Sequence, residues 1–292
     1  MQKALVVGST GLLGSRISSI LSNNYHVTCT HHRNSPLSGF KSFNLDLTNF
    51  DEVGKFFARN DFDLVINCAG LTSVEACEIR PEAAWQLNAT LPYHLAVLSK
   101  KYEARFIHVS TDHFQSDSKY PRDEKAAMWP INQYGYTKIA GEKFVLQFNE
   151  SATVIRTNFF GLTLNGSHSL LDFLVSRLSK NQGITGFEDV HFSPLGVMTL
   201  VSVISEIAKR DFPGLINAAG NETISKLDFA RMVANLTKKD QSLVSAGSVS
   251  TLGGAVSRPN FLALDGSKLA SSLTFKLPSI ESMLKIELQD AI

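Results

Sequence analysis

The sequence has few cysteines, almost no net charge and no long apolar run, and each absence excludes a class of protein. The three cysteines, Cys29, Cys68 and Cys77, are odd in number and follow no spacing pattern, so they indicate a reducing compartment and no disulfide framework. A net charge of +1 gives no electrostatic reason to expect a nucleic acid or an anionic membrane as a partner. No stretch approaches the roughly 18 uninterrupted apolar residues that a bilayer span needs.

The amino terminus also lacks the features of a secretory signal. Residues 1–7 read directly as a strand, without a charged region followed by a long apolar stretch and a cleavage site. We therefore expect a cytoplasmic protein. With 43% hydrophobic and 19% charged residues in 292, the chain is suited to one large α/β domain or to a domain with a smaller lobe.

Short apolar runs alternate with helical patterns in the first half of the chain. The expected strands are Ala4–Val7, His26–Thr30, Leu64–Ile66, Arg105–Val109 and Thr153–Ile155, and the expected helices are Leu12–Leu21, Phe50–Arg59, Pro81–Lys100 and Gln133–Phe148. Strands that are apolar on both faces and alternate with helices predict an α/β fold with a doubly wound (Rossmann) parallel sheet.

After about residue 158 the pattern loosens, which predicts a smaller C-terminal α/β lobe over the carboxyl edge of the sheet. The expected elements here are helices at Ser169–Ser179, Met198–Lys209 and Ser225–Leu236, a strand at Leu215–Ala218 and a long loop at Gly247–Arg258. We thus expect a dinucleotide-binding domain over residues 1–158, completed by about residues 195–218, and a mainly substrate-binding lobe over residues 159–292.

A glycine-rich turn joins the first expected strand to the first expected helix. Its glycines are spaced G-x-x-G-x-x-G, and the cofactor-binding residues predicted here are Gly8, Thr10, Gly11, Leu12, Leu13 and Gly14. Glycines let a pyrophosphate approach the backbone, and the helix N-terminus offers free N–H groups and the positive end of its dipole. A tight strand-to-helix turn without a ligand is the alternative interpretation.

The residues after the second strand predict which dinucleotide binds. The segment Thr30–Asn34 has no acid for the ribose hydroxyls, whereas Arg33 can pair with a 2′-phosphate through its planar guanidinium. We therefore expect NADP(H) in preference to NAD(H), with an exposed loop arginine as the alternative. His31, His32 and Cys29 have no second ligand cluster at a suitable spacing, so no metal is expected.

Two further segments belong to the expected cofactor site. The first segment is Asp46 and Leu47. The carboxylate of Asp46 either bonds the adenine amino group or caps the helix that begins near Asn49. In the second, Cys68, Ala69 and Gly70 end a buried strand in small residues, as expected where a flat cofactor passes close to the backbone. We interpret Cys68 as a small buried hydrophobic residue and not as a nucleophile.

Tyr134 and Lys138 lie four residues apart on the helix predicted over Gln133–Phe148, so they share one face. A neighbouring cation favours the phenolate and lowers a pKa that is about 10 in a free tyrosine, which lets Tyr134 exchange a proton near neutral pH. A Tyr-x-x-x-Lys pair also occurs by chance on ordinary helices. The glycine-rich turn and the segment Val109–Asp112 favour an enzyme that transfers a hydride.

Further short motifs accompany these residues along the chain. They are Gly8–Gly14, Asn67–Glu78, Val109–Asp112, Glu124–Pro130, Asn132–Glu142, Ile155–Thr157 and Ser257–Pro259 with Leu264, Asp265 and Lys268. Together they resemble the extended short-chain dehydrogenase/reductases, and among these the dTDP-4-dehydrorhamnose reductase group of sugar-nucleotide reductases. The resemblance implies a catalytic set of Thr111, Tyr134 and Lys138, with Tyr134 and Lys138 also contacting a nicotinamide cofactor.

The resemblance also implies a function. We expect reduction of a nucleotide-activated 4-keto-deoxysugar, in deoxysugar or cell-surface polysaccharide biosynthesis, by a protein that forms homodimers. Its substrate would contact Thr72, Val74, Phe159 and Arg258. Departures from the reductase motifs at Ala76, His113 and Phe159 make the reaction type better supported than the identity of the sugar.

Two other functions stay open. Epimerases and dehydratases of nucleotide sugars share the scaffold, although His113 stands where the dehydratases carry a glutamate that handles a proton. A non-catalytic NADP-binding regulatory subunit, like that of methionine adenosyltransferase, belongs to another class. The intact Thr111, Tyr134 and Lys138 argue against a purely structural role.

Overall fold

The computed structural model of the chain describes residues 1–292 except 33, 35–36, 116–117, 164–168, 252–255 and 290–292. These residues form two units. Unit 1 comprises Met1–Thr111, Asn132–Arg156 and Ile204–Ile216, and unit 2 comprises Asp112–Ile131, Thr157–Val203 and Asn217–Ile292. Residues 112–131, which lie inside the range 1–158 expected for the first domain, thus belong to unit 2.

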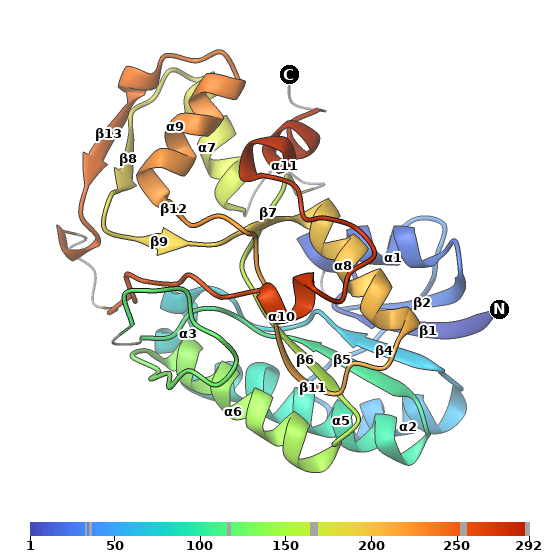
Figure 1. Ribbon diagram of the computed structural model, residues 1–292. Helices are drawn as coiled ribbons and strands as arrows, with labels where there is room; N and C mark the ends of the chain where they lie inside the picture. Colours follow the sequence, from blue (N-terminus) through green and yellow to red (C-terminus); the bar gives the residue numbers. More distant parts are fainter. Residues whose placement is uncertain (33, 35–36, 116–117, 164–168, 252–255, 290–292) are drawn as a thin grey trace. The chain divides into compact units, whose positions relative to one another are not determined.

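A seven-stranded sheet forms the centre of unit 1, in the order β11-β6-β5-β4-β1-β2-β3 (Figure 1). The strands are β1 (Gln2–Val7), β2 (Tyr25–His31), β3 (Lys41–Asn44), β4 (Leu64–Asn67), β5 (Arg105–Val109), β6 (Thr153–Thr157) and β11 (Gly214–Ala218). Neighbouring strands from β3 to β6 pair in parallel. The chain proceeds outward from β1 in one direction and from β4 in the other, which confirms the doubly wound Rossmann fold. In such folds ligands bind beyond the carboxyl ends of the strands where the strand order reverses.

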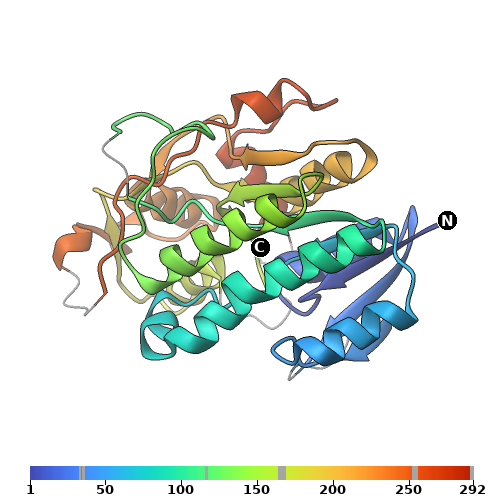
Figure 2. The same ribbon diagram turned by 90° about the horizontal axis from the view of Figure 1, so that it is seen from below.

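Helices cover both faces of this sheet. In Figure 1, α2 (Phe50–Arg59), α5 (Leu91–Lys101) and α6 (Gln133–Phe148) lie on one face and α1 (Leu12–Leu21) on the other. Figure 2 shows α5 and α6 running side by side. One hydrophobic core cluster packs strand side chains such as Leu5 and Phe106 against α2 and α5. Burial of one such side chain stabilises the fold by about 1.5–3 kcal/mol, so the apolar runs of the sequence account for this arrangement.

The helix expected over Pro81–Lys100 is correct in type but is not regular. Its first part follows α3 (Val74–Ile79) and consists of α4 (Pro81–Trp85) and a π-helical segment, Gln86–Thr90, which leads into α5. The Leu91 N–H bonds to the Gln86 carbonyl, five residues back, as a π-helix requires. A period of 3.6 residues in the sequence does not reveal such a widened turn.

Unit 2 contains short strands and several helices. The strands pair as β7 (Phe159–Phe160) with β10 (Leu195–Gly196), β9 (His191–Phe192) with β12 (Ile224–Ser225), and β8 (Ile184–Phe187) with β13 (Val244–Gly247). The helices are α7 (Leu170–Ser179), α9 (Lys226–Leu236), α10 (Ser267–Ala270) and α11 (Ile280–Glu287), with 3-10 turns at Gln241–Leu243 and Val249–Thr251. Helix α8 (Val197–Lys209) begins in unit 2 and ends in unit 1.

Local capping explains where two helices of unit 2 begin. Ser169 caps α7 by accepting the Asp172 N–H at 2.9 Å, and the Asp172 carboxylate accepts the Ser169 N–H in return. Ser225 caps α9 in the expected way, accepting the Asp228 N–H at 2.9 Å. Among the helices that the structure describes, none combines the length and apolar character that a membrane span requires.

Candidate functional site

The glycine-rich turn follows β1, and its three glycines have different structural roles. Gly8 has a φ of +78°, and a Cβ there would lie 2.7 Å from the Ala69 nitrogen. A Cβ on Gly14 would lie 2.2 Å from the Gly8 carbonyl oxygen. Close packing therefore requires glycine at both positions. Gly11 is exposed, and its Cβ would meet only the Gly8 oxygen at 3.6 Å.

Gly11 is also the N-cap of α1, and it provides no side-chain hydrogen bond to the first turn of that helix. The first N–H groups of a helix lack intrahelical partners and attract anions. An exposed glycine at this position leaves them accessible to phosphate oxygens. The residues of this turn, with Leu12 and Leu13 in the first turn of α1, therefore fit a dinucleotide.

The loop after β2 returns to the glycine-rich turn. Asn34 Nδ2 donates a hydrogen bond to Thr10 Oγ1 at 3.3 Å. Arg33 lies outside the described residues, so its contact with a 2′-phosphate stays a prediction, but its neighbour Asn34 lies beside the turn that would hold the pyrophosphate. Among the described residues, no group of three or more His, Cys, Asp and Glu side chains is arranged to hold a metal ion.

Asp46 does not cap a helix, and that alternative is wrong. Its Oδ1 accepts hydrogen bonds from the Thr48 N–H at 2.9 Å and from the Thr48 hydroxyl at 2.7 Å. The cap of α2 is Asn49, whose Oδ1 accepts the Glu52 N–H at 3.3 Å. The adenine contact stays a prediction, and half-buried Leu47 packs against the core of unit 1.

Cys68 follows β4, and its N–H bonds to the Val7 carbonyl at 2.9 Å. Burial raises the pKa of the Cys68 thiol to about 12, so the thiol is neutral at physiological pH and is not a nucleophile. The two residues after Cys68 are small because other residues lie close to their α-carbons. Ala69 packs against Gly8, and a Cβ on Gly70 would lie 2.9 Å from Asn88 Oδ1.

Asn88 is a site-forming residue that the sequence reasoning missed. It is fully buried in the π-helical segment, where its Oδ1 accepts the Leu71 N–H at 2.8 Å. Its Nδ2 donates to the Leu71 carbonyl at 2.9 Å and to Thr137 Oγ1 at 3.2 Å. Asn88 therefore ties the loop after β4 to α6, and an asparagine at a buried position of an expected helix was the available signal.

Helix α6 carries Tyr134 and Lys138. Its N-cap is Asn132, whose Oδ1 accepts the Gly135 N–H at 2.8 Å. Lys138 is 5% exposed, and its Nζ donates to the Val109 carbonyl at 2.8 Å, at the end of β5. Burial lowers the pKa of the Lys138 ammonium to about 8.

Two of the three expected catalytic residues, Thr111 and Lys138, lie at the end of β5. Thr111 is buried two residues beyond Val109, the residue that Lys138 contacts. Tyr134 is half-buried one helical turn before Lys138 on α6. That Thr111, Tyr134 and Lys138 act together on a substrate oxygen stays a prediction.

The four residues expected to contact a substrate are divided between the two units. In unit 1, Thr72 is exposed and Val74, the first residue of α3, is buried. In unit 2, Phe159 is half-buried in β7, and Arg258 is half-buried before the buried Pro259. Each of these four contacts with a substrate stays a prediction.

A buried polar cluster of unit 2 begins directly after Thr111. Asp112 is 2% exposed and accepts a hydrogen bond from Asn158 Nδ2 at 2.8 Å. Burial raises the pKa of Asp112 to about 6, although Asn158, Lys226 and Arg122 each lower it. Lys226 Nζ lies 3.3 Å from the centre of the Phe192 ring, and burial lowers the pKa of Lys226 to about 8.

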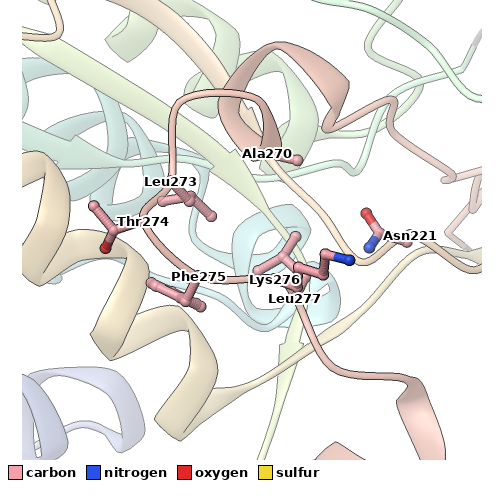
Figure 3. A pocket seen from close by; sticks show the side chains of 7 residues that line it. All are labelled: Asn221, Ala270, Leu273, Thr274, Phe275, Lys276 and Leu277. Atoms are coloured by element: carbon pink, nitrogen blue, oxygen red, sulfur yellow. The ribbon is translucent and has the colours of Figure 1, made fainter.

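Unit 2 also has a cavity of about 320 Å³ (Figure 3). It is lined by Asn221, Ala270, Leu273, Thr274, Phe275, Lys276 and Leu277. None of these residues was expected in a site. Its polar groups come from side chains such as Asn221 and Lys276, and it is open to solvent, so it does not have the enclosed walls of a cofactor pocket.

Comparison with known proteins gives a consistent family. Residues 2–291 match the family described as RmlD substrate binding domain. The chain is 28% identical to the probable low-salt glycan biosynthesis reductase Agl14 of Haloferax volcanii over 96% of the chain and 95% of that protein. It is 29% identical to a dTDP-4-dehydrorhamnose reductase of Mycolicibacterium smegmatis over 93% of the chain and 80% of that protein.

Two further similarities bear on fold and function. The chain is 28% identical to the methionine adenosyltransferase 2 subunit beta of Xenopus laevis, over 92% of the chain and 81% of that protein. Among solved structures, the dTDP-4-dehydrorhamnose reductase of Bacillus anthracis in complex with NADP superposes with a TM-score of 0.88 at 23% identity, covering 99% of each chain. This structural similarity shows the shared fold.

Proposed function

Because the chain belongs to the RmlD substrate binding domain family, we propose that it is an NADP(H)-dependent reductase of a nucleotide-activated 4-keto-deoxysugar. The observation that carries the proposal is the hydrogen bond from Lys138 Nζ to the Val109 carbonyl. This bond joins α6, which carries Tyr134, to the end of β5. Thr111 follows that strand end by two residues. Burial of a charge is unfavourable, and the place of this ammonium one helical turn after Tyr134 supports a role beside the proton donor.

The chemistry follows from the three side chains. When bound, the reduced nicotinamide supplies the hydride. Tyr134 donates its proton to the substrate oxygen, and Thr111 donates a hydrogen bond that orients the same oxygen. Lys138 remains charged at neutral pH, because its pKa is about 8, and it favours the tyrosinate that is left behind. A positioned proton donor contributes about 10²–10⁴ to the rate.

The cofactor would lie on the glycine-rich turn, with its pyrophosphate at the first turn of α1. Gly11 leaves those N–H groups accessible, and Asn34 donates a hydrogen bond to Thr10 in the same turn. A 2′-phosphate on the adenine ribose would pair with the Arg33 guanidinium. Arg33, together with the absence of an acid in Thr30–Asn34, supports NADP(H) over NAD(H).

The substrate is proposed to be a dTDP-linked sugar reduced at C4. The support is the name of the mycobacterial relative together with the intact Thr111, Tyr134 and Lys138. Arg258 is the proposed partner of the sugar diphosphate, since its guanidinium matches phosphate oxygens. Ala76, His113 and Phe159 differ from the residues of the reductase motifs, so the substrate assay is needed to identify the sugar.

The test is oxidation of NADPH, followed by its absorbance, with a panel of 4-keto nucleotide sugars that differ in base and in sugar. We expect turnover with at least one dTDP-linked member and a product reduced at C4. The similarity to the methionine adenosyltransferase regulatory subunit motivates a second candidate, a partner-binding protein. Absence of turnover with every member, together with tight binding to a methionine adenosyltransferase catalytic subunit, would establish that second function instead.

A further inference from the structure

The turn after β5 is tied to α6 at two successive residues. Lys138 Nζ donates to the Val109 carbonyl at 2.8 Å, and Ser110 Oγ donates to Glu142 Oε1 at 2.5 Å. Both donor–acceptor pairs are buried. Thr111 is the next residue in the chain, so its position relative to α6 depends on these two bonds.

Glu142 is also held by the neighbouring strand. Arg156 on β6 donates from Nη2 to Glu142 Oε2 at 2.7 Å and from Nε to both carboxylate oxygens at 3.0 Å. The Ser110 N–H bonds to the Ile155 carbonyl at 2.7 Å, so the two residues that bind Glu142 lie on paired strand ends. A buried carboxylate that accepts several charge-assisted bonds has a defined position.

The spacing on α6 connects Glu142 to the catalytic residues. Tyr134, Lys138 and Glu142 follow one another at intervals of four residues, so they lie along one face of the helix. The charge of Glu142 raises the pKa of Lys138, against the larger lowering that burial causes, and the result is about 8. Cys68 and His108 also interact electrostatically with Lys138, and both are neutral at physiological pH, while Tyr134 lies one helical turn before it on α6.

We propose that Glu142 is a positioning residue of the catalytic set: through Ser110 it fixes Thr111 against α6, and it holds a carboxylate on the helix face one turn beyond the Lys138 ammonium. The inference rests on the proposed function, which assigns the roles of Thr111 and Lys138. A carboxylate that only stabilised the fold would need its pair with Arg156 and nothing more. The additional bond to Ser110 and the place one turn after Lys138 connect it to the reacting groups.

Three variants separate these contributions. Glu142→Gln keeps the shape of the side chain and removes its charge. Ser110→Ala removes only the link to Thr111 and leaves the pair with Arg156 in place. Glu150→Gln is the matched control, because Glu150 is an exposed glutamate just after α6 that pairs with Lys100 at 2.5 Å. All are compared at a temperature well below the Tm of the least stable variant, which removes the effect of partial unfolding.

The first measurement is steady-state turnover with the accepted nucleotide sugar. A misplacement of about 1 Å can reduce a rate by about 10²-fold, so we expect kcat to fall by about 10- to 100-fold in Glu142→Gln and Ser110→Ala. The KM for NADPH should change little in Ser110→Ala, and Glu150→Gln should match the wild type. A kcat within twofold of the wild type in both Ser110→Ala and Glu142→Gln would overturn the positioning role.

The second measurement needs no substrate. Protein labelled with ¹³C at the lysine Cε atoms is titrated by NMR, and the Lys138 signal is assigned by its loss in Lys138→Arg. We expect a lower titration midpoint for Lys138 in Glu142→Gln and an unchanged midpoint in Ser110→Ala and Glu150→Gln. An unchanged midpoint in Glu142→Gln contradicts the proposal. If the wild type reduces no nucleotide sugar, the proposed function fails, and this titration alone decides the effect of Glu142 on Lys138.

Discussion

Burial determines which side chains of the candidate site carry a charge. The pKa of Lys138 falls to about 8 and that of the Cys68 thiol rises to about 12, in both cases mainly because burial disfavours the charged form. At neutral pH the lysine is therefore still an ammonium and the cysteine is a neutral thiol. Of these two groups, only the ammonium can stabilise a tyrosinate.

Tyr134→Phe keeps the aromatic ring and removes the proton that the substrate oxygen would receive. We expect turnover to fall by about 10²-fold or more, with the affinity for NADPH nearly unchanged. Stopped-flow turnover and fluorescence titration of NADPH measure the two quantities. The matched control is Tyr136→Phe, since Tyr136 is 54% exposed on the same helix, with its ring tilted by 34° to that of Trp85 at 5.9 Å. Turnover within a few-fold of the wild type in Tyr134→Phe would remove this residue from the proposed mechanism.

Arg33→Ala tests the origin of the cofactor preference. A hydrogen bond to a charged group contributes about 1.5–3 kcal/mol, so the affinity for NADPH should weaken by about 10- to 100-fold while that for NADH stays the same. Calorimetric titration with both cofactors measures the effect. Arg59→Ala, which removes an exposed arginine at the end of α2, is the control and should leave both affinities unchanged. If the wild type and Arg33→Ala prefer the same cofactor to the same degree, another residue sets the preference.

At the scale of secondary-structure elements, the sequence predicted the strands and helices whose residues form continuous apolar runs or periodic apolar patterns. The buried strands of the sheet and the helices α1, α2 and α6 agree with the expected ranges to within one or two residues. Strand β3 was not expected, because Lys41–Asn44 is an edge strand with half-exposed and exposed residues and no apolar run. Strands β8 and β13 were missed because they are short and contain exposed polar residues such as Thr185 and Ser245.

The π-helical segment could not be predicted either, because its position depends on packing against α6. A Cβ on Gly141 would lie 2.1 Å from the Asn88 carbonyl oxygen, so a glycine is needed where the two helices approach. The side chain of Asn88 then bonds to the loop after β4 and to Thr137. These partners are far apart in the chain, and a single sequence gives no signal that pairs them.

Gly141→Ala should destabilise the protein although alanine favours helices. The added methyl group would force α6 and the π-helical segment apart, and overpacking of this kind costs about 1–3 kcal/mol. The control is Gly54→Ala in α2, where a Cβ meets nothing within 4 Å; this change should stabilise the fold by about 0.5–1 kcal/mol. Urea denaturation measures both. Equal changes in the free energy of unfolding of the two variants would show that the contact between α6 and the π-helical segment does not require glycine at position 141.

At the scale of the whole molecule, the sequence predicted two parts but not which residues each contains. Residues 112–131 belong to unit 2 because of Arg122, which is 1% exposed. Its side chain donates to the carbonyls of Asp112 at 3.0 Å, Phe114 at 2.7 Å and Ala263 at 3.4 Å. Ala263 is 141 residues away in the chain. Neither the amino-acid composition nor the hydrophobic periodicity reveals a buried arginine that binds backbone carbonyls. The alternation of strands and helices in the sequence therefore could not assign this segment to unit 2.

The pairing of Tyr134 with Lys138 was easier to predict from the sequence than the contacts that surround it. Tyr134 and Lys138 lie on one helix, and the fixed period of the helix places them together. Glu142 and Arg156 come from different elements, and only the packing of α6 on β6 brings them into contact at 2.7 Å. Local spacing therefore reveals residues that share an element, whereas residues that meet through the tertiary fold need a structure.

Asp112 gives the stability of the whole protein a pH dependence that can be measured. Its folded-state pKa of about 6 exceeds the ordinary value of 3.8, chiefly through burial, despite the opposing effects of Asn158, Lys226 and Arg122. As the pH rises from about 4 to about 6, the unfolded chain loses this proton first, so the contribution of Asp112 to the free energy of unfolding falls. Below this range the group is protonated in both states, and above it the loss is complete, at about 3 kcal/mol.

The variant Asp112→Asn is neutral at every pH and should not show this loss. We expect its free energy of unfolding, relative to that of the wild type, to rise by about 3 kcal/mol between about pH 4 and about pH 7. Urea denaturation at a series of pH values measures the difference between the two proteins, and other titrating groups cancel in it. Asp61→Asn is the control, because the Asp61 side chain is 89% exposed and its removal takes no charge out of a buried site. A difference between Asp112→Asn and the wild type that stays constant across this range would mean that Asp112 is ionised in the folded protein as readily as in the unfolded chain, and that its hydrogen bond from Asn158 offsets the burial in full.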